Sequence, residues 1–183
     1  MKTNMNWVPY ASTVALAFGA TLAPMTVHSK IYVSIEQAQQ LIFGAEHLTL
    51  QPIVLTRETQ EKMRQASSVA HPFQSGRIWR TSTGGWFIVD EVIGKHEMIT
   101  YAVGVNPDGS VRQIEILEYK ETYGYEVAEP AWRTQFVGKT ASSTLKLNQD
   151  IENISGATLS AKHLTDGVKR VMVMVGLALK ASD

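Results

Sequence analysis

The chain has 183 residues, of which 44% are hydrophobic, and this size and apolar content suit one globular domain. Its 17 basic and 17 acidic residues cancel, so it lacks the excess positive charge that nucleic-acid binding normally requires. Because it contains no cysteine, disulfides, thiolate metal sites and cysteine nucleophiles are excluded, and any redox chemistry falls to a cofactor.

The first 29 residues have the features of a secretory signal peptide. Lys2 precedes an uncharged stretch with its apolar centre at 13–23, and small residues suited to cleavage precede a cut after Ser29. An uncleaved membrane anchor is the alternative, because residues 7–27 are long enough to cross a bilayer. In both cases we expect the remainder, 30–183, to form one domain outside the cytoplasm.

Two short peripheral helices are expected at the start of this domain. Ser34 is a potential N-cap before an apolar series that ends at Gly44. Thr56 opens a second helix, which we expect to run to about Ala66.

Four strand-like segments follow, rich in β-branched and aromatic residues and separated by turn formers. They span residues 77–82, 85–92, 98–105 and 111–119. This pattern predicts a meandering antiparallel sheet. Strict alternation along the last strand places Ile114 and Ile116 on the buried face, and Val111 and Tyr119 on the opposite one.

Helical segments close the chain. Pro130 can open a helical turn through Phe136, because proline is tolerated at the first helical position. From Leu159, apolar residues recur every three or four positions, which indicates a long amphipathic helix, and its second half, 171–179, is apolar enough to predict burial. The solvent-facing side is expected to carry Lys162, Asp166, Lys169 and Arg170. The predicted fold class is α+β, an antiparallel sheet packed against helices.

Two segments resemble parts of enzyme motifs but lack residues that those motifs require. His96-Glu97 begins a zinc-protease motif, but Thr100 stands where the second histidine belongs. Residues 136–140 end like a phosphate-binding loop, yet Arg133 replaces the first glycine and no strand leads into it. Since no pair of histidines has ligand spacing, we assign no catalytic residue and no metal site.

The segment 150–160 places two hydroxyls around a Gly-Ala step, directly before the long helix. In one interpretation, Thr158 or Ser155 caps the helix and Gly156 takes an unusual backbone angle. In the other, the amides and positive dipole end of the helix start suit a phosphate or phosphodiester beside Thr158, for which Gly156 and Ala157 leave room.

Residues 155–160, Ser-Gly-Ala-Thr-Leu-Ser, resemble the Ser/Thr-Gly-Ala-Thr motif of a family of FMN-binding domains. These domains occur in the C and G subunits of sodium-pumping NADH:quinone reductase and the Rnf complex, and in NosR-type regulators. The resemblance implies FMN as the cofactor, joined through a phosphoester to the final threonine of the motif, Thr158. It implies that the surrounding residues also bind the cofactor, namely Ser155, Gly156, Ala157, Leu159 and Ser160.

The resemblance covers about 85–183. Residues 118–124 are similar to the family's loop built around Glu-Thr-Pro-Gly, and 130–139 fit the stretch after it. Two positions depart from the pattern, since Glu152 stands where many relatives have aspartate and Tyr123 replaces proline. The remaining residues of the loop, Glu121, Thr122 and Gly124, either form a polar loop over the flavin or an ordinary strand end.

Other side chains near these segments have two interpretations each. Tyr119, Tyr123, Tyr125 and Trp132 offer rings for stacking on a flavin, or they belong to the core or an interface. Lys139 meets the cofactor phosphate or an acidic partner, or it is exposed to solvent.

The resemblance also implies how the protein matures and works. Members of the family receive FMN from a magnesium-dependent flavin transferase that cleaves FAD, and a bonded cofactor cannot diffuse out of the cell envelope. We therefore expect an electron-transfer flavoprotein in the periplasm or on the outer face of the cytoplasmic membrane, with membrane or periplasmic redox proteins as partners and no nucleic acid. The alternatives are an FMN-dependent reductase with its own small-molecule acceptor, and a non-redox sensory or binding module without flavin.

Overall fold

The computed structural model describes residues 31–179 of the protein. The signal peptide or anchor expected over 1–29 lies outside the described residues, as does Lys30. In the described part, the strands form one antiparallel sheet with the order β1-β6-β5-β4-β3-β2. The α+β class predicted from the sequence is confirmed.

The four predicted strands all form, within one or two residues of their expected ends. The bounds are β1 (Ile31–Tyr32), β2 (Leu48–Leu50), β3 (Ile78–Thr81), β4 (Trp86–Ile93), β5 (Met98–Val105) and β6 (Val111–Tyr119). The two edge strands, β1 and β2, were not predicted. Each is too short to show an alternating pattern, and pairing with a neighbouring strand defines it.

The pairing of β5 with β6 is interrupted at two places. Its register jumps past Arg112 and Leu117, so each is an extra residue of the kind found in β-bulges. Each extra residue reverses the alternation, and Val111, Ile114, Ile116 and Tyr119 all join the main core. The expectation that Val111 and Tyr119 face the other side is therefore wrong, whereas the burial of Ile114 and Ile116 is confirmed.

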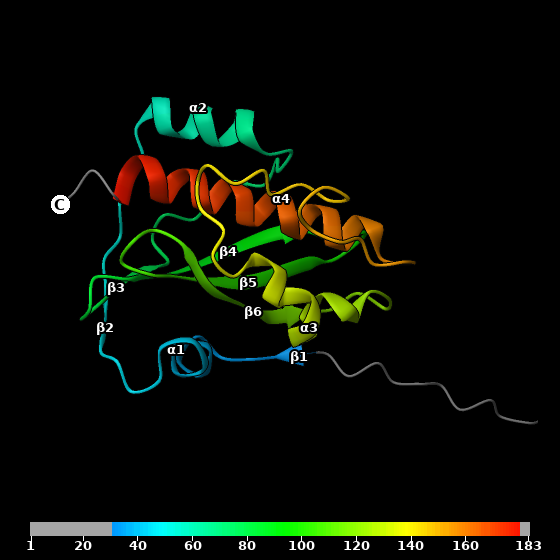
Figure 1. Cartoon of the computed structure of the whole chain (residues 1–183), viewed down its shortest axis with the longest axis horizontal. Coiled ribbons are helices and arrows are strands. Elements are labelled where there is room, and N and C mark those ends of the chain that lie inside the picture. The colour runs from blue at the N-terminus through cyan, green and yellow to red at the C-terminus, as the bar shows by residue number, and fades with distance from the viewer. Residues whose placement is uncertain (1–30, 180–183) are drawn as a thin grey trace, which may run out of the picture.

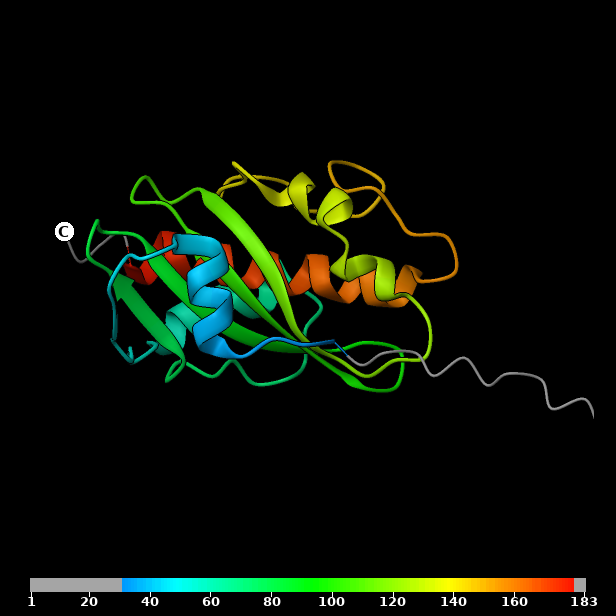
Figure 2. The same ribbon diagram turned by 90° about the horizontal axis from the view of Figure 1, so that it is seen from below.

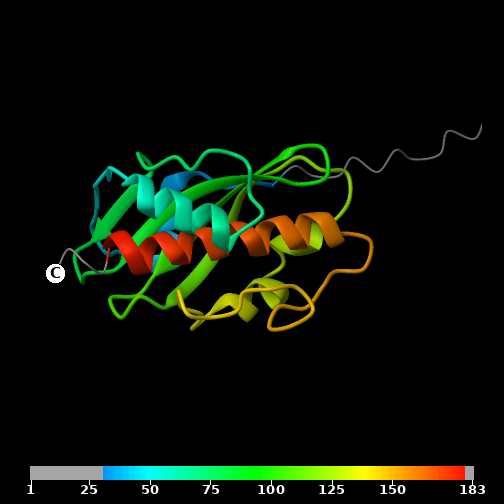
Figure 3. The ribbon, with the colours of Figure 1, turned by 90° about the horizontal axis from the view of Figure 1, so that it is seen from above.

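Helices cover both faces of the sheet in successive layers (Figure 1). Helix α4 (Thr158–Met174), continued by the wider turn η3 (Val175–Leu179), crosses one face. Helix α2 (Arg57–Ala66) packs on the outer side of α4, as the view from above shows (Figure 3). Helix α1 (Ile35–Phe43) lies across the strands on the opposite face (Figure 2).

Local capping signals explain where α1 and α2 begin and end. The Ser34 hydroxyl accepts a hydrogen bond of 3.1 Å from the Gln37 N–H, and Gly44 ends α1 with a φ of +64°. The Thr56 hydroxyl accepts 3.1 Å from the Thr59 N–H at the start of α2. Both predicted helices are confirmed in place and as outer layers of the fold.

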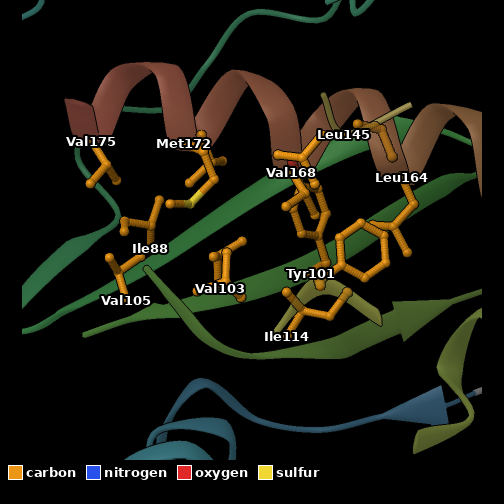
Figure 4. Packing of buried hydrophobic residues seen from close by; sticks show 14 of the residues in the cluster. Ile88, Tyr101, Val103, Val105, Ile114, Leu145, Leu164, Val168, Met172 and Val175 are labelled. Atoms are coloured by element: carbon orange, nitrogen blue, oxygen red, sulfur yellow. The ribbon is translucent and has the colours of Figure 1, made fainter. Parts of the chain in front are cut away.

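The main core lies between α4 and the sheet. Figure 4 shows side chains of α4 and η3 pointing onto the strands, with Leu164, Val168, Met172 and Val175 above Ile88, Tyr101, Val103 and Val105. A smaller cluster on the other face joins Ala38 and Ile42 of α1 to Phe87 and Ala102 of the sheet. Burial of most of the apolar run 171–179 is confirmed, although Leu177 is 36% exposed.

The prediction that Arg170 faces solvent is wrong. Arg170 is 3% exposed, and its guanidinium donates to the Asp90 carboxylate of β4 at 2.6 and 2.8 Å. The Tyr101 hydroxyl donates to the same carboxylate at 2.6 Å. The outer side of α4 is itself covered here, because Arg170 also donates to the His71 carbonyl oxygen and lies 5.7 Å from the centre of the Phe73 ring.

The other polar residues of α4 are only partly covered. The Lys162 ammonium pairs with the Asp166 carboxylate at 2.7 Å and donates to the Ser68 hydroxyl at 2.8 Å. The Lys169 ammonium donates to the Thr144 carbonyl oxygen at 2.7 Å. These three side chains lie on the outer side of the helix, as predicted.

A helical stretch follows the sheet. It comprises the 3₁₀ turn η1 (Tyr125–Ala128), the short helix α3 (Pro130–Arg133) and the 3₁₀ turn η2 (Thr134–Phe136). The predicted turn from Pro130 to Phe136 is confirmed. Within residues 31–179, none of the helices combines the length and apolar character needed to cross a bilayer.

Candidate functional site

Helix α4 begins within the Ser-Gly-Ala-Thr motif. Its N-cap is Ala157, no side chain makes the capping hydrogen bond there, and Thr158 is the first helical residue. Gly156 has a φ of +81°, the left-handed conformation that glycine adopts readily. The prediction that Thr158 or Ser155 caps the helix is therefore wrong. Because the first N–H groups of a helix have no partner within it, this helix start suits an anion.

Thr158 projects from this helix start and is exposed. Its Oγ1 lies 3.1 Å from the side-chain nitrogen of Asn153. The side-chain oxygen of Asn153 accepts 2.8 Å from the Ile154 N–H. The hydroxyl is therefore accessible and also held by a neighbour in the preceding loop.

The residues around Thr158 differ in exposure. Ser155 and Gly156 are exposed in the loop, and Leu159 is 44% exposed on the helix. Ala157 and Ser160 are buried and point toward the protein. The motif thus presents Thr158 outward from a backbone that Ala157 and Ser160 hold in place.

The segment ahead of the motif is fixed by α3 and η2. The Trp132 indole N–H donates 2.8 Å to the Glu152 carbonyl oxygen, and the side-chain oxygen of Gln135 accepts 2.7 Å from the Glu152 N–H. The Trp132 ring is buried and meets Phe136 edge to face. Trp132 therefore belongs to the core, and the backbone of Glu152 is bonded on both sides while its side chain is exposed.

Asp150 organises the loop that leads to this segment. Its carboxylate accepts from the N–H groups of Leu145 and Lys146 at 3.0 and 2.8 Å, and it lies 3.2 Å from the Lys139 ammonium. Burial opposes ionisation of Asp150, but these N–H groups and Lys139 outweigh it and lower the pKa. The sequence left open whether Lys139 meets a phosphate, an acidic partner or solvent. In the structure its acidic partner is Asp150 of the same chain.

The loop after β6 meets the motif directly. Gly124 has a φ of +86°, and a Cβ there would lie 2.7 Å from the Cβ of Ala157. The Tyr119 hydroxyl donates 2.5 Å to the Tyr123 carbonyl oxygen and lies 3.3 Å from the Ser160 Oγ. Burial raises the pKa of Tyr119, so its hydroxyl keeps its proton. The two segments that carry the family resemblance are therefore neighbours in space.

Glu121 and Thr122 point in other directions. The Glu121 carboxylate accepts from the N–H groups of His96 and Glu97, at 2.6 and 3.0 Å, in the turn between β4 and β5. Partial burial opposes its ionisation, but the backbone donors of this turn outweigh it and lower the pKa. Thr122 is exposed. The Glu121 side chain thus stabilises a neighbouring hairpin, while the loop itself lies against the motif.

Exposed apolar side chains occur in the motif and in the segment that contacts it. Tyr123 is 75% exposed, Tyr125 50% and Leu159 44%. They belong to the loop and the helix start, which the contact of Gly124 with Ala157 brings together. Flat aromatic rings bind well to such surfaces. Of the four rings considered from the sequence, Tyr119 and Trp132 are core residues and the other two are exposed.

A buried carboxylate oxygen lies close to this loop. In the part of the chain that the structure describes, the Oε2 of Glu126 is the buried side-chain oxygen without a hydrogen-bond partner. Glu126 follows Gly124 by two residues. Burial is the main cause of the raised pKa of Tyr119; the hydrogen bond with Ser160 opposes it, and the nearby Glu121 and Glu126 add to it. A buried acceptor without a hydrogen bond is costly, and this oxygen lies just after the loop that contacts the motif.

Sequence reasoning missed the roles of Asn153, Tyr119 and Glu126. Asn153 lies inside the motif region, and only the folded loop turns its amide toward Thr158. The Tyr119 contacts depend on the bulge at Leu117 in β6, which cannot be predicted from the sequence of that strand alone. Among residues 31–179, no cluster of three or more histidine, aspartate or glutamate side chains is arranged to hold a metal ion.

A cavity of about 960 Å³ lies elsewhere, between α2 and the segment 67–75. Arg170 contributes to its lining, whereas no residue of the motif or of the 121–124 loop does. This cavity is therefore separate from the motif.

Residues 94–173 match the FMN-binding domain family, a stretch that starts at the β4–β5 turn and ends within α4. No curated protein matches the chain. The residues present fit this cofactor, since the helix start without a side-chain cap suits its phosphate and the exposed tyrosines suit its ring. Residues 94–173 are therefore an FMN-binding domain, and FMN is the cofactor of this domain.

Proposed function

We propose that FMN is joined through its phosphate to the Oγ1 of Thr158, and that the protein carries electrons in the cell envelope. The observation that supports this most directly is the position of Thr158. Its hydroxyl is exposed at the first residue of α4, where no side chain caps the helix. A phosphate on that oxygen would lie at the positive end of the helix dipole.

Attachment requires a second protein, because a threonine hydroxyl is a weak nucleophile without a base. A magnesium-dependent flavin transferase would supply FAD and that base. Thr158 Oγ1 attacks the FMN-side phosphorus of FAD, the pyrophosphate bond breaks, AMP leaves, and the hydroxyl proton passes to the base. No electron is transferred in this step.

The surface location of Thr158 favours a carrier. FMN supplies one- and two-electron chemistry, and a ring tethered beside the exposed Tyr123 and Leu159 would be accessible to a protein partner. We propose membrane or periplasmic redox proteins as these partners. The signal-like residues 1–29 support a location in the periplasm or on the outer face of the cytoplasmic membrane.

The attachment is tested by intact-mass measurement after co-expression with a flavin transferase. The wild-type chain should gain the mass of FMN less one water, and Thr158→Ala should not. Thr144→Ala, which removes another exposed threonine hydroxyl, should gain the mass as the wild type does. A gain that persists in Thr158→Ala would overturn the assignment.

Electron transfer is tested with the flavinylated protein after chemical reduction. As a carrier, it should be reoxidised by a redox protein from the envelope and show no saturable turnover of small-molecule acceptors. Saturable turnover of a metabolite would instead favour an FMN-dependent reductase.

A further inference from the structure

We propose that Asn153 is a positioning residue for flavin attachment, which rests on the attachment to Thr158 proposed above. The side-chain amide of Asn153 donates a hydrogen bond of 3.1 Å to the Thr158 Oγ1. Neither the family match nor the motif resemblance assigns a role to this residue.

The orientation of the Asn153 amide follows from its second contact. Its Oδ1 lies 2.8 Å from the Ile154 backbone nitrogen, which can only donate. The oxygen must therefore face Ile154, and the NH₂ group must face Thr158. Donor and acceptor are thus assigned by the backbone, and Asn153 gives an N–H to the threonine oxygen.

The loop that presents Asn153 is itself held. The preceding residue, Glu152, is hydrogen-bonded at its N–H by Gln135 and at its carbonyl oxygen by Trp132. Lys162, one helical turn beyond Thr158, has its ammonium on Asp166 and Ser68. Within the described residues, Asn153 is therefore the side chain that is hydrogen-bonded to the Thr158 hydroxyl.

This hydrogen bond has the polarity that attachment needs. A hydroxyl oxygen has two lone pairs and one proton. The Asn153 N–H occupies one lone pair, which leaves the second for phosphorus and the proton for the base of the transferase. As that proton leaves, negative charge develops on Oγ1, and the bond from Asn153 strengthens. It also survives the reaction, because an ester oxygen still accepts a hydrogen bond.

The contact also orders the nucleophile. Thr158 is exposed, so its side chain would otherwise sample several χ1 rotamers. The bond to Asn153 selects one of them before the transferase binds. Preorganisation of this kind speeds the chemical step more than it tightens binding.

The test is the steady-state rate of flavinylation of the full chain by a flavin transferase with FAD and Mg²⁺, followed by intact mass. Asn153→Ala removes both contacts of the amide. Asn153→Asp keeps an acceptor for the Ile154 N–H but replaces the donor to Thr158 with an acceptor. We expect each to lower kcat about tenfold, with KM for this protein changed less than about twofold.

Gln149→Ala is the matched control, because it truncates another exposed amide in the same loop and should leave kcat unchanged. If Asn153→Ala unfolds, as thermal melting would show, Asn153→Asp decides the question. A wild-type rate in Asn153→Asp, or a loss confined to KM, would overturn the positioning role. If the wild type gains no FMN, the proposed function itself fails, so the two failures are distinguishable.

Discussion

Gly124 and Ala157 are in direct contact, although one follows the last strand and the other precedes the last helix. A Cβ on Gly124 would lie 2.7 Å from the Cβ of Ala157 and 2.7 Å from the Tyr119 hydroxyl oxygen, which is too close for either atom. The contact joins the loop after β6 to the motif, so the shape of the candidate flavin site depends on it.

Gly124→Ala should lower the free energy of unfolding by about 3 kcal/mol. The added methyl group must displace Ala157 or Tyr119, and alanine is also disfavoured at a φ of +86°. Urea unfolding followed by tryptophan fluorescence measures the change. Flavinylation should also slow, because the motif backbone must move.

Gly138→Ala is the matched control for this substitution. Gly138 has a φ of +77°, but a Cβ there would meet no atom within 4 Å. It should cost only about 1 kcal/mol, which is the backbone strain alone. Equal losses in the two variants would show that the contact with Ala157 does not contribute.

Tyr119→Phe should lower the free energy of unfolding by about 1 kcal/mol, because the Tyr123 carbonyl oxygen loses its donor. Tyr123→Phe is the control, since the Tyr119 bond uses the backbone of residue 123 and persists in that variant. Thermal melting of the two proteins compares them. If Tyr123→Phe destabilised the protein more than Tyr119→Phe does, the hydrogen bond from Tyr119 to the Tyr123 carbonyl oxygen would not be the source of the stability.

Arg170→Met should lower the free energy of unfolding by about 4 kcal/mol, because it leaves the Asp90 carboxylate buried without its cation. Adding Asp90→Asn should recover part of this loss, since a neutral amide costs less to bury. Lys169→Met, at the neighbouring and less buried position, should cost less than about 1 kcal/mol. Chemical denaturation at neutral pH measures the free energy of unfolding of each variant and of Asp90→Asn alone. If the loss in the double variant equals the sum of the losses in the two single variants, Arg170 and Asp90 are not coupled.

Glu121→Gln should cost about 1 kcal/mol at neutral pH, because the partly exposed carboxylate accepts two backbone N–H groups of the β4–β5 turn. The pKa of Glu121 is lower in the folded protein, although burial opposes this shift. Its contribution is therefore complete above the unfolded pKa of about 4.3 and is lost as the pH falls through the folded value. Urea unfolding of both proteins from pH 7 to pH 3 should show their difference constant down to about pH 5 and vanishing below. A difference independent of pH would exclude the charge as its cause.

Much of the fold was predictable because its signals are local. The caps at Ser34 and Thr56 and the glycine at 44 act within one helical turn, and each marked a helix correctly. The long strands have their own composition and turns. The bulges at Arg112 and Leu117 were missed because they depend on the pairing of two strands, which one strand does not encode.

The candidate site divides in the same way. Residues 155–160 identified the family and the expected cofactor, because a short motif carries its chemistry in residue type and order. The neighbours of Thr158 were not predictable, since Asn153, Tyr119 and Gly124 approach the motif only after the loop and the sheet have folded.

The amino-acid sequence by itself determined the α+β class, the main elements and the motif at the start of the last helix, because these depend on periodicity, capping and residue chemistry within short segments. Only the tertiary structure decided that Arg170 is buried on Asp90, that Ala157 takes the N-cap position and that Gly124 lies against the motif. Those outcomes depend on contacts between segments far apart in the chain, and a linear pattern does not contain them.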